Sequence, residues 1–280
     1  MSGAEGPNVD ERVVAGFGDE WNHFDQSGVP DEELQRIFEE YFAVFPWASI
    51  EPDAVGFDVG CGTGRWAKFV APRVGRLHCI DASAQALEVA RRNLAAHENC
   101  EFHVATVDRI PLPDASADFG YSLGVLHHVP DTAAGIRQCT AKLKKDAPFL
   151  VYLYYQFDNR PAWYRALWRM SEVFRRVVSR LPRAMRFAVS DGFALLVYWP
   201  LARLARLIEA SGLSADQLPL YYYRRRSLYT IRTDALDRFG TRLEQRFARD
   251  EVFRMMRSAG LKDIRFSEQP PFWCAVGIRE

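Results

Sequence analysis

The 280-residue sequence lacks the features that mark secreted, membrane-spanning or zinc-binding proteins. Its first residues, MSGAEGPNVDERVV, contain neither a basic nor an apolar stretch, so we expect no secretion signal. No apolar run approaches the ~20 residues that a bilayer-spanning helix needs. The five cysteines are scattered, without a CxxC pair or a Cys/His cluster. We therefore expect a cytoplasmic protein with reduced cysteines and no metal site.

The chain also lacks net charge, which argues against nucleic acid as a default partner. The charge is unevenly distributed, however. Residues 160–257 contain 20 arginines, no lysine and nine acidic residues, a balance of +11 that the rest of the chain offsets. Arginine binds carboxylates and phosphates through a bidentate fork. This aromatic-rich segment is therefore suited to cover a substrate with an apolar body and an anionic group, although a solvated helix face explains the same charges.

Short apolar runs alternate with helical patterns from about residue 54 to residue 155, which is typical of parallel βαβ units. We expect helix caps at Ser83 and Asp131. Residues 156–247 are helical and aromatic-rich, and the tail returns to a helix followed by a strand pair. The predicted fold is α/β, a doubly wound, mostly parallel sheet of seven strands with a helical insertion after the fifth. The strands are expected at 54–60, 75–81, 100–107, 117–126, 147–155, 261–269 and 271–280.

A glycine-rich loop follows the first expected strand, in GFDVGCGTGRWAKF. Gly60, Gly62 and Gly64 come after Asp58, and Arg65 stands where the dinucleotide fingerprint requires its third glycine. Glycines at this place let the backbone turn sharply and approach a ligand closely. The spacing therefore suits a nucleoside that carries an amino acid better than it suits NAD, and it disfavours a dehydrogenase.

The stretch DVGCGTG resembles motif I of the class I S-adenosylmethionine-dependent methyltransferases, in their small-molecule branch with a type 11-like domain. Three further matches follow in order: the acidic Asp81, the segment VDRIPLPDASADF and the segment GYSLGVLHHVPD. The resemblance covers about residues 55–155 and the last 30 or so. It implies a Rossmann-like core, S-adenosyl-L-methionine as cofactor and S-adenosyl-L-homocysteine as product.

The same resemblance assigns roles to individual residues. Asp81 is expected at the ribose hydroxyls and Asp108 at the adenine amino group, while Asp58 and Gly60 are expected near the methionine part. The full set of expected cofactor contacts is Asp58, Gly60, Cys61, Gly62, Gly64, Asp81, Ala82, Asp108, Arg109, Leu123 and Trp21. Trp21 belongs to a helix that either closes over the cofactor or packs against the core, and both interpretations stay open.

His127 and His128 are the candidate proton acceptors, because unperturbed histidine titrates near neutrality. Adjacent histidines at this place also serve simply to cap or to pack. The expected division of the chain is an N-terminal helical cap (1–45), a cofactor-binding core (46–155), a helical substrate cap (156–247) and the rest of the core (248–280).

The leading hypothesis is a methyltransferase that modifies an oxygen or nitrogen, or less readily a carbon, of a small, partly apolar and anionic molecule. One alternative is an RNA-modifying enzyme that uses the basic insertion, but no Asn/Asp-Pro-Pro-Tyr segment follows the fourth strand. A second is an enzyme of a lipid-like substrate with peripheral membrane contact, because residues 193–202 are uncharged and precede Arg203 and Arg206. A third is a non-catalytic module that keeps the cofactor site. Oligomeric state is not predicted.

Overall fold

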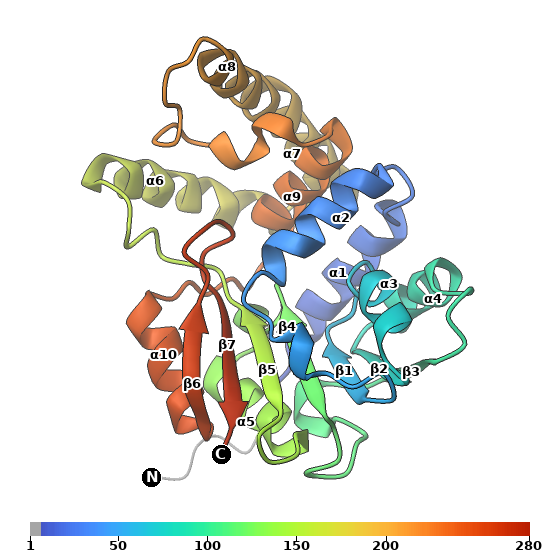
Figure 1. Ribbon diagram of the computed structural model, residues 1–280. Helices are drawn as coiled ribbons and strands as arrows, with labels where there is room; N and C mark the ends of the chain where they lie inside the picture. The colour runs from blue at the N-terminus through green and yellow to red at the C-terminus, as the bar shows by residue number, and fades with distance from the viewer. Residues whose placement is uncertain (1–6) are drawn as a thin grey trace. The chain divides into compact units, whose positions relative to one another are not determined.

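The computed structural model describes residues 7–280, and its central element is one seven-stranded sheet (Figure 1). The strand order is β3-β2-β1-β4-β5-β7-β6, and only β7 runs antiparallel to its neighbours. The predicted mostly parallel sheet and the C-terminal strand pair are therefore confirmed. The strands are β1 Val55–Val59, β2 Arg76–Asp81, β3 Cys100–Val104, β4 Phe119–Leu123, β5 Pro148–Tyr152, β6 Leu261–Phe266 and β7 Cys274–Arg279.

Helices cover both faces of this sheet, because successive side chains of each buried strand point to opposite faces. On one face Phe57 and Phe149 pack with residues of α5 and α10, and on the other Leu77 and Tyr121 pack with residues of α3 and α4. The helices that belong to the same unit as the sheet are α1 Glu11–His23, α3 Ala67–Val70, α4 Ala84–Asn93, α5 Thr132–Lys142 and α10 Arg249–Ser258. Helix α2, Asp31–Tyr41, belongs only in part to that unit.

The expected helix caps are confirmed. The Ser83 hydroxyl accepts a hydrogen bond from the Ala86 N–H at 3.3 Å at the start of α4, and an Asp131 carboxyl oxygen accepts one from the Ala134 N–H at 2.8 Å at the start of α5. Each cap satisfies a backbone donor that the first turn of a helix leaves unpaired. These caps fix where the two helices begin, α4 directly after β2 and α5 after the turn that follows β4.

The chain divides into two compact units, which we call the sheet unit and the helical unit. The sheet unit comprises the residues up to Asp25, Gln35–Tyr155 and Leu243–Glu280, and the helical unit comprises Gln26–Leu34 and Gln156–Arg242. The helical unit thus agrees with most of the expected substrate cap and adds a segment of the expected N-terminal cap. Residues 1–6 of that cap lie outside the described residues.

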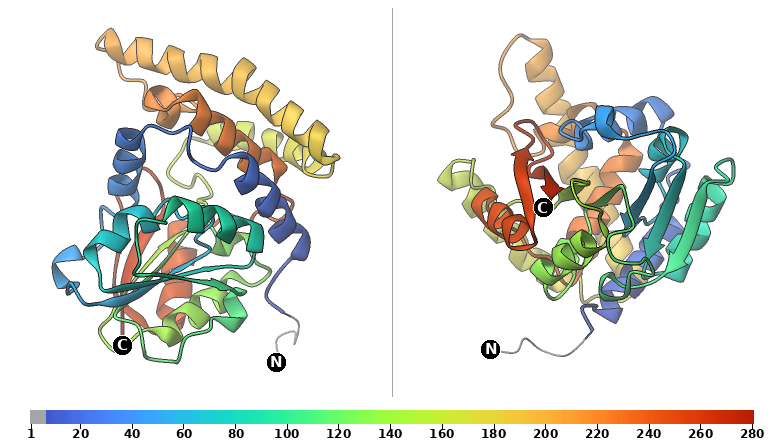
Figure 2. Two further views of the ribbon diagram at one scale, coloured as in Figure 1. Left: turned by 90° about the vertical axis from the view of Figure 1, so that its right-hand side faces the viewer. Right: turned by 60° about the horizontal axis from the view of Figure 1, so that its bottom comes forward.

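The helical unit contains α6 Ala162–Val178, α7 Arg183–Phe193, α8 Trp199–Ala210 and α9 Leu228–Gly240. A π-helical turn at Ala194–Tyr198 joins α7 to α8, so that Figure 2 shows one unbroken helix. Its 28 residues, Arg183–Ala210, are long and apolar enough to cross a membrane by length and composition. Its longest uncharged run, residues 192–202, nevertheless stays below the ~20 residues of a continuous apolar span. Pro200 does not break the helix, because the wider turn before it accommodates the missing N–H.

Candidate functional site

The glycine loop leaves the carboxyl end of β1 in a backbone conformation that side chains rarely adopt. Gly60 has φ +77° and Gly62 has φ +54°. A Cβ atom at Gly60 would lie 2.3 Å from a methyl carbon of Val125, so this position has no space for a side chain. The loop is therefore a bare stretch of backbone at the mouth of the sheet, as its sequence predicts.

Asp81, at the end of β2, binds this loop directly. One carboxyl oxygen accepts a hydrogen bond from the Gly62 N–H at 2.9 Å, and the other accepts one from the Ser83 N–H at 2.8 Å. Burial raises the pKa of Asp81 above its usual value, and the two backbone donors oppose that rise. Each carboxyl oxygen keeps a lone pair for a further donor. The contact with the ribose stays a prediction, but the carboxylate is held at the loop.

Asp58 lies inside β1 and is fully buried. Neither of its carboxyl oxygens makes a hydrogen bond of standard geometry among residues 7–280, and the buried Tyr121 hydroxyl is the polar neighbour that most counters the effect of burial. Burial raises the pKa of Asp58 well above its usual value; the Tyr121 hydroxyl lowers it, and the Asp81 carboxyl adds to the rise. Because buried polar groups in folded proteins are nearly always well paired, this carboxyl is a candidate to accept a hydrogen bond from a bound ligand.

A second buried carboxyl oxygen without a partner in the described chain belongs to Asp108, in the short 3₁₀ helix Val107–Arg109. The exposed Arg109 guanidinium reaches only to 4.0 Å of the other oxygen. At the end of β4, Leu123 is buried and Gly124 has φ +80°. A Cβ atom at Gly124 would meet nothing within 4 Å, so the chain leaves open space beside this strand end.

The remaining residues of the expected cofactor set contribute less. The Cys61 side chain is packed into the core, where burial raises its pKa to about 11, so only its backbone faces the loop. Ala82 is half-buried between Asp81 and the helix cap. Gly64 completes the loop with φ +78°. Their roles as contacts stay predictions.

Trp21 on α1 lies against the glycine loop. Its indole nitrogen is 3.3 Å from the place where a Cβ atom of Gly62 would stand, and the Arg65 guanidinium carbon is 5.8 Å from the ring centroid. Phe17, one turn earlier, stacks on Trp21 with ring centroids 6.3 Å apart. The N-terminal helix therefore brings an aromatic side chain onto the loop, and both interpretations of Trp21 stay open.

The two histidines follow β4 in the 3₁₀ turn Leu126–His128. The His127 ring is fully buried and stacks on Tyr154 with centroids 3.8 Å apart. Neither of its ring nitrogens has a hydrogen-bond partner within residues 7–280. Burial lowers the pKa of His127 well below its usual value, with His128 and Arg246 acting in the same direction. His127 is therefore a neutral ring at physiological pH.

His128 is held differently. Its Nδ1 lies 2.7 Å from the carbonyl oxygen of Leu243, and a carbonyl can only accept, so Nδ1 carries the proton. This tautomer leaves the lone pair on Nε2, the form that a general base requires. The Phe17 ring lies 4.9 Å from the His128 ring, centroid to centroid. Helix α1 therefore touches both the glycine loop and the histidine pair.

The segment 243–247 supports the histidine turn, and the sequence analysis missed it. The Gln245 N–H donates to the His127 carbonyl at 3.0 Å, and the Gln245 amide donates to the Val129 carbonyl at 2.7 Å. The Phe247 N–H donates to the Tyr154 carbonyl at 2.9 Å. We had assigned these residues to the insertion, because nothing in their local pattern indicates a return to the sheet.

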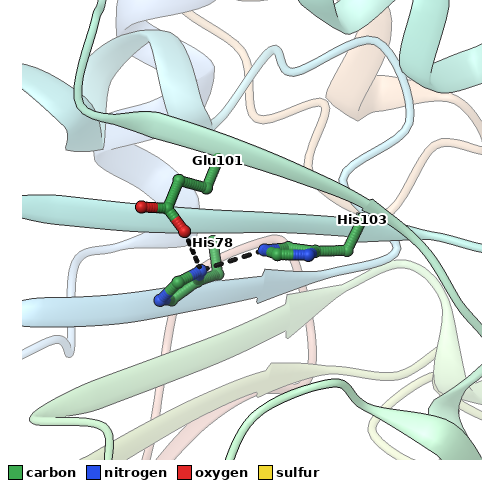
Figure 3. A group of neighbouring side chains, drawn as sticks. All are labelled: His78, Glu101 and His103. Carbon is green, nitrogen blue, oxygen red and sulfur yellow. Dashed lines mark hydrogen bonds and ion pairs between the residues drawn. The ribbon is translucent and has the colours of Figure 1, made fainter.

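A cluster of polar side chains on β2 and β3 was also missed (Figure 3). His78 Nδ1 lies 3.0 Å from His103 Nε2 and 3.3 Å from a Glu101 carboxyl oxygen, and Arg76 pairs with the other oxygen at 3.2 Å. The ligand atoms of the three lie within 4.8 Å of one another, close enough for one metal ion. Only the parallel register, which sets His78 beside Glu101, brings them together.

Comparison with known proteins finds likenesses to methyltransferases. A family model described as a methyltransferase domain matches residues 57–151, the stretch from β1 to β5. The uncharacterized methyltransferase YcgJ of Bacillus subtilis (strain 168) is 31% identical over 127 residues, which are 45% of this chain and 50% of that protein. The chain thus spans half of the length of this relative.

Two further likenesses extend beyond the core. The ubiquinone biosynthesis O-methyltransferase of Neisseria meningitidis is 26% identical over 235 residues, covering 80% of this chain and 91% of that protein. A chain in the complex between the Haloferax volcanii Trm112 methyltransferase activator and a methyltransferase has a TM-score of 0.50 and 15% identity, covering 93% of this chain and 96% of its own, and shows likeness of fold. Residues 57–151 thus match a methyltransferase domain, and a larger part of the chain is similar to named methyltransferases.

Proposed function

We propose that the protein binds S-adenosylmethionine at the glycine loop and transfers its methyl group to an oxygen or nitrogen of a small molecule. The observation that carries this proposal is the Asp58 carboxyl, buried beside the loop with neither oxygen paired within residues 7–280. A dinucleotide would bring a pyrophosphate to this loop, which a neighbouring carboxyl disfavours. An amino-acid-bearing nucleoside brings an ammonium group, which Asp58 suits.

The other residues fit the same ligand. Asp81 is held by the loop and retains acceptor capacity for ribose hydroxyls, and Asp108 retains a buried unpaired oxygen for a donor such as the adenine amino group. Trp21 lies against the loop at Gly62. The bare backbone and the open space at Gly124 leave room where side chains would otherwise stand. These observations support the roles assigned above to this set of residues.

When bound, the cofactor supplies an activated methyl group on its sulfonium. The protein then needs to orient an acceptor, exclude water and accept a proton where the acceptor carries one. We assign proton acceptance to His128, because its Nδ1–H is committed to the Leu243 carbonyl and its lone pair is on Nε2. His127 is the weaker candidate, since burial disfavours its protonated form.

The acceptor class rests on a relative and on charge. The Neisseria relative, which matches most of this chain, is named as an O-methyltransferase of ubiquinone biosynthesis, and this supports an oxygen on a partly apolar molecule. The arginine content of the helical unit suits an anionic group on it. Many of these arginines are already engaged, for example Arg232 with Asp191 at 2.7 Å and Arg224 with Glu209 at 3.1 Å. This pairing within the fold weakens the charge argument for an anionic acceptor and for the RNA alternative alike.

The proposed location is the cytoplasm, where the five free cysteines would stay reduced. Four of them are buried apolar-like side chains.

Calorimetry tests the proposed cofactor. The protein should bind S-adenosylhomocysteine and should not bind NAD. Asp81→Ala should weaken S-adenosylhomocysteine binding by about 1–3 kcal/mol, because it leaves hydrogen-bond donors of loop and ligand unpaired. Asp146→Ala, which removes an exposed carboxylate of the same unit, is the matched control and should bind as the wild type does. Tight binding of NAD without S-adenosylhomocysteine binding would overturn the proposal.

A turnover assay tests the acceptor. The protein with S-adenosylmethionine should release S-adenosylhomocysteine in the presence of phenols or amines that carry an apolar body and a carboxylate. His128→Gln should lower that rate by about 10²-fold or more while sparing cofactor affinity. A His128→Gln variant at full rate would remove this residue from the mechanism without touching the cofactor assignment.

A further inference from the structure

Helix α6 of the helical unit turns both apolar and charged side chains toward the rest of the unit. Phe174 packs on Phe193 and Phe239, Arg175 is buried, and Glu172 is half-buried. The Glu172 carboxylate pairs with Arg175 and with Arg238 of α9, at 3.2 Å for the second, and Arg175 also donates to the Thr241 carbonyl at 2.6 Å. The face that packs against the rest of the unit is thus held by an ion-pair network.

The opposite face of α6 is apolar and exposed. Met170 keeps 70% of its surface exposed, and the other members are also exposed side chains that recur every three or four residues, which places them on one stripe of the helix. The apolar stripe consists of Trp163, Leu167, Met170, Val173 and Val177. Soluble proteins rarely leave so many large apolar side chains in a continuous row.

Positive charge borders this stripe. Arg169, Arg176 and Arg180 are exposed, and their spacing of seven and four residues places them along one edge of it. The unit as a whole holds 16 arginines, no lysine and ten acidic residues in 26–34 and 156–242, a balance of +6. An apolar row with an arginine border is the pattern of a helix that lies in the headgroup region of an anionic bilayer.

The continuous helix of α7 and α8 presents a second exposed apolar row. Leu196 is 80% exposed, while Ala194 and Ala202 on the other side pack against Ile231 and Ala235 of α9. The exposed members are Met185, Leu195, Leu196, Leu201, Leu204 and Leu207. The alanines and the aromatic Tyr198 and Trp199 thus pack within the unit, while the leucines and Met185 remain exposed.

Charged residues interrupt the apolar stretch of this helix. Asp191 is tied to Arg232 of α9 at 2.7 Å, and Arg203 donates to the carbonyls of Arg224 and Arg226. Between Asp191 and Arg203 only eleven residues, 192–202, are uncharged. At about 1.5 Å per residue they cover roughly half of a hydrocarbon core. The helix therefore suits the membrane surface rather than its interior.

We propose that the apolar faces of α6 and α7–α8 dock the protein onto a membrane surface that carries anionic lipids. The arginines beside the α6 stripe attract the negatively charged lipid headgroups, and the apolar rows gain free energy by leaving water for the lipid. A second copy of this chain is the less suitable occupant, because it would bring the same net positive charge to the contact. This proposal concerns the helical unit and does not depend on the proposed enzymatic function.

Vesicle flotation with the full chain tests the proposal. The protein should float with vesicles of phosphatidylcholine mixed with phosphatidylglycerol and should stay in solution with phosphatidylcholine alone. Met170→Asp with Leu196→Asp should weaken binding by about tenfold or more, since each change removes exposed apolar area. Arg169→Gln with Arg180→Gln should weaken it in a salt-dependent way.

Val104→Asp provides the matched control, because Val104 is equally apolar and 61% exposed but lies in the sheet unit. It should float as the wild type does, and all variants should keep S-adenosylhomocysteine affinity. Three outcomes overturn the proposal: no flotation with any vesicle, flotation unchanged in Met170→Asp with Leu196→Asp, or a dimer in solution that this double variant dissociates. The last outcome would assign the surface to a second copy.

Discussion

The two units of this protein differ in what they leave unsatisfied. The sheet unit packs large apolar residues on both faces of the sheet, and its buried polar groups without partners in the described chain include Asp58 and His127, which lie at the predicted site. The helical unit has a small apolar cluster around Ile231 and Ala235, pairs Glu172 with Arg175 and Arg238, and exposes many leucine, methionine and valine side chains.

The difference shows where each unit has free energy to gain from another molecule. An unpaired buried carboxyl gains from a small ligand that brings a donor or a cation. Exposed apolar rows gain from an extended surface that removes them from water. An unpaired buried carboxyl is typical of a cofactor site, and an exposed apolar row is typical of a docking face. The following variants change one kind of buried group at a time, from the largest expected effect to the smallest.

Glu172→Gln should have the largest effect on stability, a loss of about 3 kcal/mol, because it leaves Arg175 and Arg238 buried without their counter-charge. Although burial alone would raise it, the arginines hold the pKa of Glu172 at about 2, below its usual 4.5. The contribution is therefore complete above pH 4.5 and is lost as the pH falls toward 2. Denaturant unfolding followed by tryptophan fluorescence measures it.

Glu209→Gln is the matched control, since Arg224 and Arg225 also hold the pKa of Glu209 at about 2, but on the surface. Solvent screens this cluster, so the loss should be clearly smaller. Equal losses for the two variants would show that burial does not set the strength of the Glu172 network.

Asp58→Asn should have a moderate effect on the free energy of unfolding, opposite in sign to that of Glu172→Gln. It should stabilise the ligand-free protein by about 1–2 kcal/mol at neutral pH. Burial raises the pKa of Asp58 in the folded state, so the unfolded chain loses this proton at lower pH than the folded one. Stability therefore falls as the pH rises above 3.8, and the gain from asparagine should shrink toward that pH.

Thermal unfolding across pH checks this, with Asp114→Asn, an exposed carboxylate, as the unchanged control. The same Asp58→Asn variant should bind S-adenosylhomocysteine more weakly. A variant that is neither more stable nor weaker in binding would mean that Asp58 has a partner in solution and does not serve a ligand.

His127→Phe should have the smallest effect. Burial lowers the pKa of His127 in the folded protein. Below about pH 6.5 the imidazole is therefore protonated in the unfolded chain but stays neutral in the folded protein. Wild-type stability should fall as the pH decreases, by at most about 1.4 kcal/mol per pH unit, and His127→Phe should fall less steeply. His23→Gln, on the surface of α1, should follow the wild type in urea unfolding.

Much of the sheet unit could be predicted from the sequence, because its signals are local. Alternating apolar runs, the caps Ser83 and Asp131, and the glycines after β1 each act within a few residues of where they stand. The placement of Asp58, Asp81 and Asp108 at neighbouring strand ends follows from a parallel sheet alone. The sequence also predicts a helical insertion at residues 156–247, although 243–247 belong to the sheet unit.

What a side chain faces could not be predicted in the same way. The periodicity of α6 shows that it is amphipathic, but not that Glu172 and Arg175 face inward while Met170 faces water; only the position of Arg238 on α9 decides that. The pairing of His78 with Glu101 depends on the β2–β3 register, and the return of residues 243–247 to the histidine turn depends on long-range hydrogen bonds. The sequence by itself determined the order of strands and helices along the chain and the glycine loop after β1, since these arise from neighbouring residues. Only the tertiary structure decided which polar groups are buried without partners and which apolar faces remain exposed, since burial is a property of contacts between distant segments.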